Sequence, residues 1–187
     1  PGLIALAVLF GTTSMEAIVI TFEKRVGALE RLFLAPISLS TIMLSKILGG
    51  TIFGIVISTV MTLLTTLLIG ARITNILGFI ILLILTALVH SALGALVAVS
   101  VKEVFEAQTL SNYFRFPMIF LCGIFIPLEK MPVVLRSLAM VLPLTYSVDG
   151  FRVLMGTGGS ILFEIAVLSL YTVLLITLSV RLLKKNL

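Results

Sequence analysis

The chain has 187 residues, of which 60% are hydrophobic and only 11% are Asp, Glu, Lys or Arg. An average soluble domain carries roughly 25% charged residues, and a soluble core of this size cannot hide so much apolar surface from water. The composition therefore excludes a soluble globular domain and predicts an all-α, polytopic membrane protein in contact with the lipid bilayer.

The net charge of +5 would suggest a nucleic-acid partner in a soluble protein. In a membrane protein, basic residues gather at the cytoplasmic ends of spanning helices, so we expect no nucleic-acid binding. The single cysteine, Cys122, excludes an internal disulfide.

Apolar stretches of spanning length recur along the chain, and a helix needs about 20 mostly apolar residues to cross the hydrocarbon core. We expect five spans, at residues 2–21, 47–69, 76–100, 108–126 and 161–180. The first begins directly after Pro1 without the basic leader of a signal peptide. We therefore expect a fragment of a longer subunit.

One long polar interruption covers residues 22–46, and residues 22–36 are its first part. Phe22, Val26, Leu29 and Phe33 follow at spacings of four, three and four, which places them on one face of a helix. Pro36 predicts the end of that helix. Ser38 or Ser40 is expected to cap the start of the next helix. This pattern indicates a short amphipathic helix at the membrane surface. The alternative is a charged loop whose apolar stripe rests on lipid.

Residues 127–160 separate the fourth and fifth expected spans. The apolar segment 132–142 is too short to cross, which favours a re-entrant or interfacial helix. Pro143 separates it from a second short helix at 146–155, for which Thr145 is a candidate cap. Asp149 and Arg152 are three residues apart and are expected to pair. This region is predicted to form a helical hairpin.

Orientation follows from the basic residues in the connections. One side would hold Lys24, Arg25, Arg31, Lys46, Lys102, Arg181, Lys184 and Lys185, and the other Arg72, Lys130, Arg136 and Arg152. The first set predicts that residues 22–36 and the C-terminus face the cytoplasm. The hairpin then faces outward.

Four residues inside the expected spans are candidates for function, because an ionisable side chain there is costly and usually faces protein or water. Glu16 either reaches the lipid headgroups or lines a substrate path. His90 is expected to be a neutral imidazole bonded to a neighbouring helix, with a proton relay as the alternative. Asn112 and Arg115 share a helix face; Arg115 either extends to the interface or lines the path with Asn112.

No enzyme motif is present in the sequence, and we expect no catalytic, metal or cofactor site in this chain. There is one His and one Cys, without metal-ligand spacing. The glycine-rich stretch at 156–160 lacks the Gly-Lys-Ser/Thr ending of a phosphate-binding loop. We interpret it as a flexible connector.

Several short motifs together resemble the permease subunit of ABC-2 type transporters, especially the daunorubicin-resistance and nodulation-export branch. Pro1-Gly-Leu3 resembles the start of that family's second membrane helix. Gly27-Ala-Leu-Glu-Arg-Leu32 and Pro36 resemble its cytoplasmic Gly-Thr-x-Glu-x-Leu…Pro stretch. The outer hairpin signature is matched by Gly123-Ile-Phe-Ile-Pro127, Glu129, Pro132, Pro143-Leu-Thr-Tyr146, Asp149 and Arg152. Lys24-Arg25 and Ala28 depart from the family's usual Arg-Glu and Thr.

The resemblance implies a single domain over residues 1–187 with six spans, five of them present here. It implies an exporter of the cell membrane built from two permease subunits, identical or different, and two separate ATPase subunits that hold ATP and Mg²⁺. Residues 22–36 would be the coupling helix, with ATPase contacts at Val26, Gly27, Leu29, Glu30, Arg31 and Pro36. Residues 127–160 would form an outer gate through Gly123, Pro127, Glu129, Pro143, Tyr146, Asp149 and Arg152. Glu16, His90, Asn112 and Arg115 are the candidates for the substrate path.

The expected substrate is an amphipathic drug, lipid or glycan-like compound. An exporter of sodium or another ion is the alternative within transport, although few carboxylates lie in the spans. A non-transporting anchor would need the surface helix but no polar residues inside the bundle. An intramembrane enzyme would need a second catalytic group beside His90, and no motif supplies one.

Overall fold

The computed structural model describes residues 1–156 and 158–185, and all regular elements within these ranges are helical. In chain order they are α1 (Gly2–Arg25), α2 (Ala28–Phe33), α3 (Leu39–Ile69), α4 (Ile76–Ser100), α5 (Val104–Leu121), the 3₁₀ turn η1 (Leu128–Lys130), α6 (Val133–Met140), α7 (Pro143–Met155) and α8 (Leu162–Lys185). The predicted all-α bundle is confirmed. Thr157, in the expected glycine-rich connector, lies outside the described residues, as do Asn186 and Leu187.

Four helices are long and apolar enough to cross a membrane, namely α1, α3, α4 and α8. The pair α6–α7 is bent by 90° at its break, as in a broken span or a re-entrant loop, and counts as a fifth candidate if taken as one span. The structure differs from the prediction at the fourth expected span, residues 108–126. The helix there is α5, which starts four residues earlier and is not among the four, since Glu106, Asn112 and Arg115 interrupt its apolar sequence.

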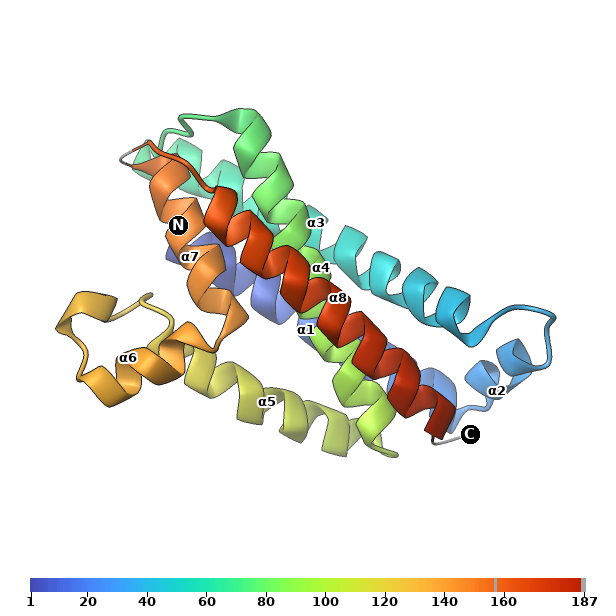
Figure 1. Ribbon diagram of the computed structural model, residues 1–187. Coiled ribbons are helices and arrows are strands. Elements are labelled where there is room, and N and C mark those ends of the chain that lie inside the picture. The colour runs from blue at the N-terminus through green and yellow to red at the C-terminus, as the bar shows by residue number, and fades with distance from the viewer. Residues whose placement is uncertain (157, 186–187) are drawn as a thin grey trace.

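Helix α4 forms the centre of the bundle, with 61% of its apolar stretch buried against 17% for α3 and 22% for α8. It packs against α1, α3, α7 and α8, and Figure 1 shows it between α8 and α1. The outer faces of α3 and α8 are covered with exposed Leu, Ile, Val and Phe side chains. Such faces are stable in lipid, where no water has to be excluded.

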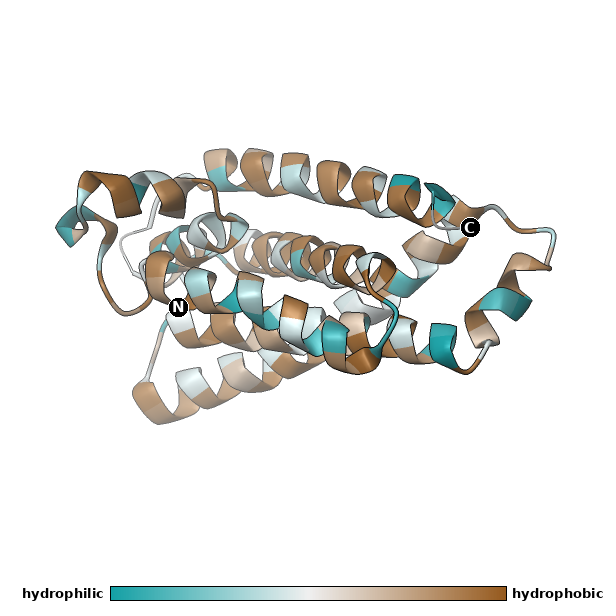
Figure 2. Ribbon diagram, turned by 90° about the horizontal axis from the view of Figure 1, so that it is seen from below, coloured by the Kyte–Doolittle hydropathy of each residue, from teal (hydrophilic) through white to brown (hydrophobic). Residues whose placement is uncertain are grey.

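The two ends of the bundle differ in charge. One, which we call the basic end, carries α2, the end of α8 and the α4–α5 loop; α2 and the end of α8 lie at the same end of the bundle in Figure 1. The opposite, hairpin end carries α6, α7 and the N-terminal residue. The long helices are mostly apolar along their ribbons, whereas α2 mixes hydrophilic and hydrophobic residues (Figure 2). The helix order thus places the eight predicted basic residues at one end and the other four at the opposite end.

The expected helix at 22–36 is broken in the structure. Helix α1 continues to Arg25, and α2 begins only at Ala28 and has six residues. Gly27 adopts φ 70°, a left-handed conformation in which a glycine avoids the strain of a Cβ atom, and this turn separates the two helices. Phe22 therefore belongs to the spanning helix. The start of α3 agrees with prediction, because the Ser38 hydroxyl accepts the Thr41 N–H at 3.1 Å.

Helix α1 approaches α3 and α4 closely at glycines. A Cβ atom on Gly54 of α3 would overlap the Thr12 methyl group of α1. A Cβ atom on Gly94 of α4 would lie 2.7 Å from the Thr13 carbonyl oxygen and 3.1 Å from the Thr13 Cα. At Gly94 the added Cβ atom would meet backbone atoms of α1 rather than a flexible side chain. Helices α1 and α4 therefore have to separate if Gly94 is replaced.

We predict that Gly94→Ala destabilises the bundle by about 1–3 kcal/mol, the usual cost of overpacking. Thermal unfolding in detergent measures this as a lower midpoint. Gly49→Ala is the matched control, since a Cβ atom on Gly49 meets nothing within 4 Å. A Gly94→Ala protein as stable as the control would contradict the close approach of α1 and α4.

Candidate functional site

Helix α2 exposes most of the residues expected to contact an ATPase. Val26, Glu30, Arg31 and Pro36 are all exposed at the basic end. Leu29 differs from that expectation, because its side chain is only 1% exposed and packs in the hydrophobic core. Leu29 therefore anchors α2 to the bundle and turns the charged side of the helix outward. Gly27 supplies the turn that allows this orientation.

Two basic side chains at the end of α1 contact the α4–α5 loop. The Lys24 ammonium donates to the Val101 carbonyl oxygen at 3.0 Å, and Arg25 lies 3.7 Å from the Glu103 carboxylate. Glu103 in turn begins α5, where it forms a reciprocal capping box with Glu106. The segment just before α2 is thus connected to the start of α5.

A second contact joins α1 to α3. The Lys46 ammonium donates to Glu23 Oε1 at 2.5 Å, and both side chains are about three-quarters buried. Charge-assisted hydrogen bonds of this kind are short and strong when water is partly excluded. The two helices that flank α2 are therefore held together within about two turns of their basic ends.

Glu16 lies inside the bundle and does not extend to the membrane surface. Its side chain is 3% exposed, and its Oε1 has no hydrogen-bond partner. Because α1 continues to Arg25, Glu16 is more than two turns from the helix end. A Cβ atom on Gly50 would overlap Glu16 Oε2 and lie 2.5 Å from the Ser91 hydroxyl. The carboxylate therefore sits at the junction of α1, α3 and α4.

Arg115 is also inside the bundle and does not reach the interface. Its side chain is 1% exposed, and Nη1 donates to the Ser14 hydroxyl of α1 at 2.6 Å. The guanidinium lies 5.3 Å from the centre of the Phe10 ring, a cation–π distance. Its Nη2 has no partner among the described residues. Asn112, one turn earlier, is half-buried.

His90 is fully buried in α4, but it bonds to its own helix. Its Nδ1 lies 2.7 Å from the Thr86 carbonyl oxygen, and its Nε2 has no partner in the described structure. The expected bond to a neighbouring helix is therefore wrong. The polar link between α4 and α7 is made instead by the Thr86 hydroxyl, which donates to Ser147 Oγ at 3.1 Å. Within the ranges described, no three His, Cys, Asp or Glu side chains form a group that could hold a metal.

The hairpin is held in place by side chains of the predicted outer gate. Arg152 donates to Asp149 Oδ1 at 3.2 Å, which confirms the expected pair, and to the Gly123 carbonyl at 2.9 Å. The Tyr146 hydroxyl donates to the Met140 carbonyl at 2.7 Å. Pro143 begins α7, so the helix starts three residues before the predicted position.

The predicted cap of α7 has another role. Since α7 already begins at Pro143, the Thr145 hydroxyl does not cap it and instead donates to the Ala139 carbonyl at 2.5 Å. This bond closes the bend between α6 and α7. Pro127 precedes η1, and the Glu129 side chain is exposed there.

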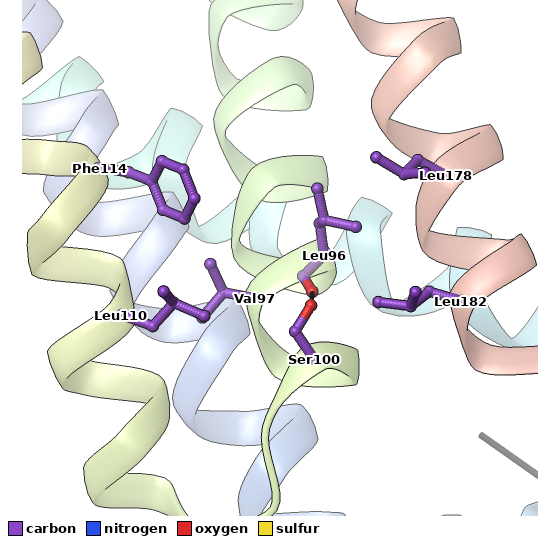
Figure 3. Close-up of a pocket in the computed structure, with 7 residues that line it drawn as sticks. All are labelled: Leu96, Val97, Ser100, Leu110, Phe114, Leu178 and Leu182. Atoms are coloured by element: carbon purple, nitrogen blue, oxygen red, sulfur yellow. Dashed lines mark hydrogen bonds between the residues drawn. The ribbon is translucent and has the colours of Figure 1, made fainter. Parts of the chain in front are cut away.

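An apolar groove of about 220 Å³ lies over α4 between α5 and α8. In Figure 3, side chains of α5 and α8 approach from opposite sides the face of α4 that carries Leu96 and Val97. The Ser100 hydroxyl is the polar group of this lining, and it is bonded to the Leu96 carbonyl at 2.7 Å. No residue expected for the substrate path lines this groove.

The sequence interpretation missed the residues that surround the buried charges. Gly50, Ser91 and Gly94 border Glu16, while Ser14 and Phe10 receive Arg115. One signal was available, since Gly50 and Gly54 are four residues apart, the spacing of close helix contacts in membranes.

Comparison with known proteins agrees with this architecture. Residues 1–155 match the family model described as ABC-2 type transporter. The chain is 24% identical over 152 residues to the protein named inner membrane transport permease YadH of Escherichia coli K12, and the corresponding proteins of Escherichia coli O157:H7 and Shigella flexneri give the same values. The match covers 81% of this chain and 59% of each relative, so the chain spans little more than half their length. Because the family model covers most of the sequence, the chain belongs to the ABC-2 type transporter family.

Proposed function

We propose that the chain is the membrane-spanning permease of an ATP-driven exporter of the cell membrane. Its motifs favour the daunorubicin-resistance and nodulation-export branch, and the exported compound is an amphipathic drug, lipid or glycan-like molecule. ATP and Mg²⁺ bind to a separate ATPase that docks on α2 at the cytoplasmic, basic end. A second permease subunit, identical or different, completes the transport path.

The arrangement of α2 carries this proposal. The buried Leu29 side chain anchors the helix to the bundle, and Glu30 and Arg31 are exposed on it. The turn that follows α2 adds Leu34, which is 87% exposed, and Ile37. A surface that combines exposed apolar side chains with charges is typical of a protein interface. The adjoining end of α1 is linked to α3 and to the start of α5, so the rigid-body motion of a partner docked on α2 could reach the spanning helices.

The buried polar residues favour transport over the anchor hypothesis. An anchor would need only the surface helix, whereas this bundle encloses Glu16, His90 and Arg115. Ionisable groups in a membrane interior are costly, and they commonly mark the path of a substrate or ion. Glu16 and Arg115 remain the residues proposed for the substrate path, with Asn112 beside Arg115.

We predict that Leu34→Glu weakens ATPase association at least about tenfold, equivalent to about 1.4 kcal/mol, because it places a carboxylate in an apolar contact. Co-purification and titration of the full-length subunit with its ATPase measure the loss. Leu34 is so exposed that the substitution leaves the fold intact. Val133→Glu, an equally exposed apolar position at the hairpin end, is the control. Equal ATPase binding by both variants would contradict docking at α2.

A second prediction concerns the link between α1 and the α4–α5 loop. Lys24→Met removes the hydrogen bond to the Val101 carbonyl while leaving the exposed face of α2 unchanged. We expect normal ATPase association but a several-fold lower ratio of exported compound to hydrolysed ATP in proteoliposomes. Lys102→Met, an exposed lysine in the same loop, should have no effect. Unchanged coupling in Lys24→Met would show that the loop does not transmit motion.

A further inference from the structure

A groove of about 480 Å³ runs between α1 and α3 on the surface of the bundle. Its walls are largely apolar, and it is lined by Met15, Glu16, Val19, Ser45, Lys46, Gly49, Gly50, Ile52, Phe53 and Val56. Ile52 and Val56 are more than half exposed, so the groove opens at the exposed face of the two helices. Its volume is in the range of small-molecule sites.

The acidic group of the groove is the Glu16 carboxylate, and Ser45 and Lys46 are the other polar side chains of the lining. Gly50 lacks the Cβ atom that would overlap Glu16 Oε2, so the glycine makes room for the acid at the groove wall. Oε1 is buried and has no hydrogen-bond donor. Since a buried carboxylate oxygen without a donor is costly, Oε1 leaves the site open to a partner that supplies a donor.

The charges around this carboxylate leave an excess of one acid. Lys46 is the basic side chain among the described residues that line the groove with Glu16. The Lys46 ammonium is already held by Glu23 Oε1 at 2.5 Å, which balances those two charges. Glu16 has no cation of its own, and the groove is therefore complementary to a positive ligand.

We propose that this groove binds an amphipathic organic ammonium, with its N–H group donating to the Glu16 carboxylate and its apolar body lying against Ile52, Phe53 and Val56. The inference deepens the proposed export function and rests on it for the identity of the ligand as a substrate.

The chemistry of the wall favours an ammonium over a metal ion. A single carboxylate offers one or two oxygens, whereas Na⁺-like or divalent cations require about six oxygen ligands. An ammonium is satisfied by one or two acceptors and can place its alkyl or aryl portion on the apolar side chains. A neutral compound would leave the Glu16 charge without a partner.

The test uses the complete transporter with its ATPase, in phosphatidylcholine nanodiscs without nucleotide. The probe is dansylcadaverine, which joins a primary ammonium to a fluorescent apolar group, and its N-acetyl derivative is the neutral counterpart. We expect saturable binding of the amine, weakened about tenfold or more by Glu16→Gln with binding of the acetylated probe unchanged. Glu164→Gln, the same change in α8, should leave amine binding as in the unsubstituted protein.

Gly49→Leu provides a second, independent variant. Because Gly49 lines the groove and a Cβ atom there meets nothing, the leucine should fill the groove without disturbing the helices and weaken binding of both probes. Unchanged amine binding in either Glu16→Gln or Gly49→Leu would overturn the proposal. Equal affinity for the two probes, or no saturable binding, would also overturn it. ATPase docking is measured separately through Leu34→Glu, so a failure here is distinct from a failure of the export function.

Discussion

The close approach of α1 to α3 and α4 is the contact on which the arrangement of this bundle depends. Lipid tails are as apolar as leucine, so helices in a membrane gain little by burying apolar side chains against each other. Association then depends on tight van der Waals contact, which small residues permit. Gly50, Gly54 and Gly94 provide it, and the α1 residues opposite them are Thr12, Thr13 and Glu16. The same contact that assembles the helices also encloses the buried carboxylate.

Helix α1 connects the surface helix to the interior. It is continuous over 24 residues, from the hairpin end to the turn at Gly27. Its basic end is linked to the α4–α5 loop through Lys24 and to α3 through Glu23. Further along, Ser14 binds Arg115 of α5. A displacement of α2 would therefore move α1 as a unit and reach α3 and α5 at the same time.

The sequence was sufficient for the helical class and for the polarity of the bundle, because both follow from long apolar runs and from the distribution of Lys and Arg. The paired Asp149 and Arg152 were also predictable, since their spacing of three residues brings them together within one helix. Local spacing of this kind is visible in a single sequence.

Contacts between helices were not predictable in the same way. The pattern of Phe22, Val26 and Leu29 fits one continuous helix, yet the left-handed turn at Gly27 divides it. The sequence left open whether Glu16 reaches the headgroups, because the span was expected to end at Thr21, whereas α1 continues to Arg25. The partner of Arg115 depends on how α5 lies against α1, and no periodicity in either helix encodes that distance.

The two buried charges lie on different sides of α1. Residues two positions apart in a helix point about 200° away from each other, so Ser14, which receives Arg115, and Glu16, which faces Gly50, are on opposite faces. The guanidinium and the carboxylate therefore do not neutralise each other, although both are enclosed. Each keeps an atom without a partner. A single rigid helix thus separates an acidic site beside α3 from a basic site beside α5, and any rotation of α1 changes the surroundings of both.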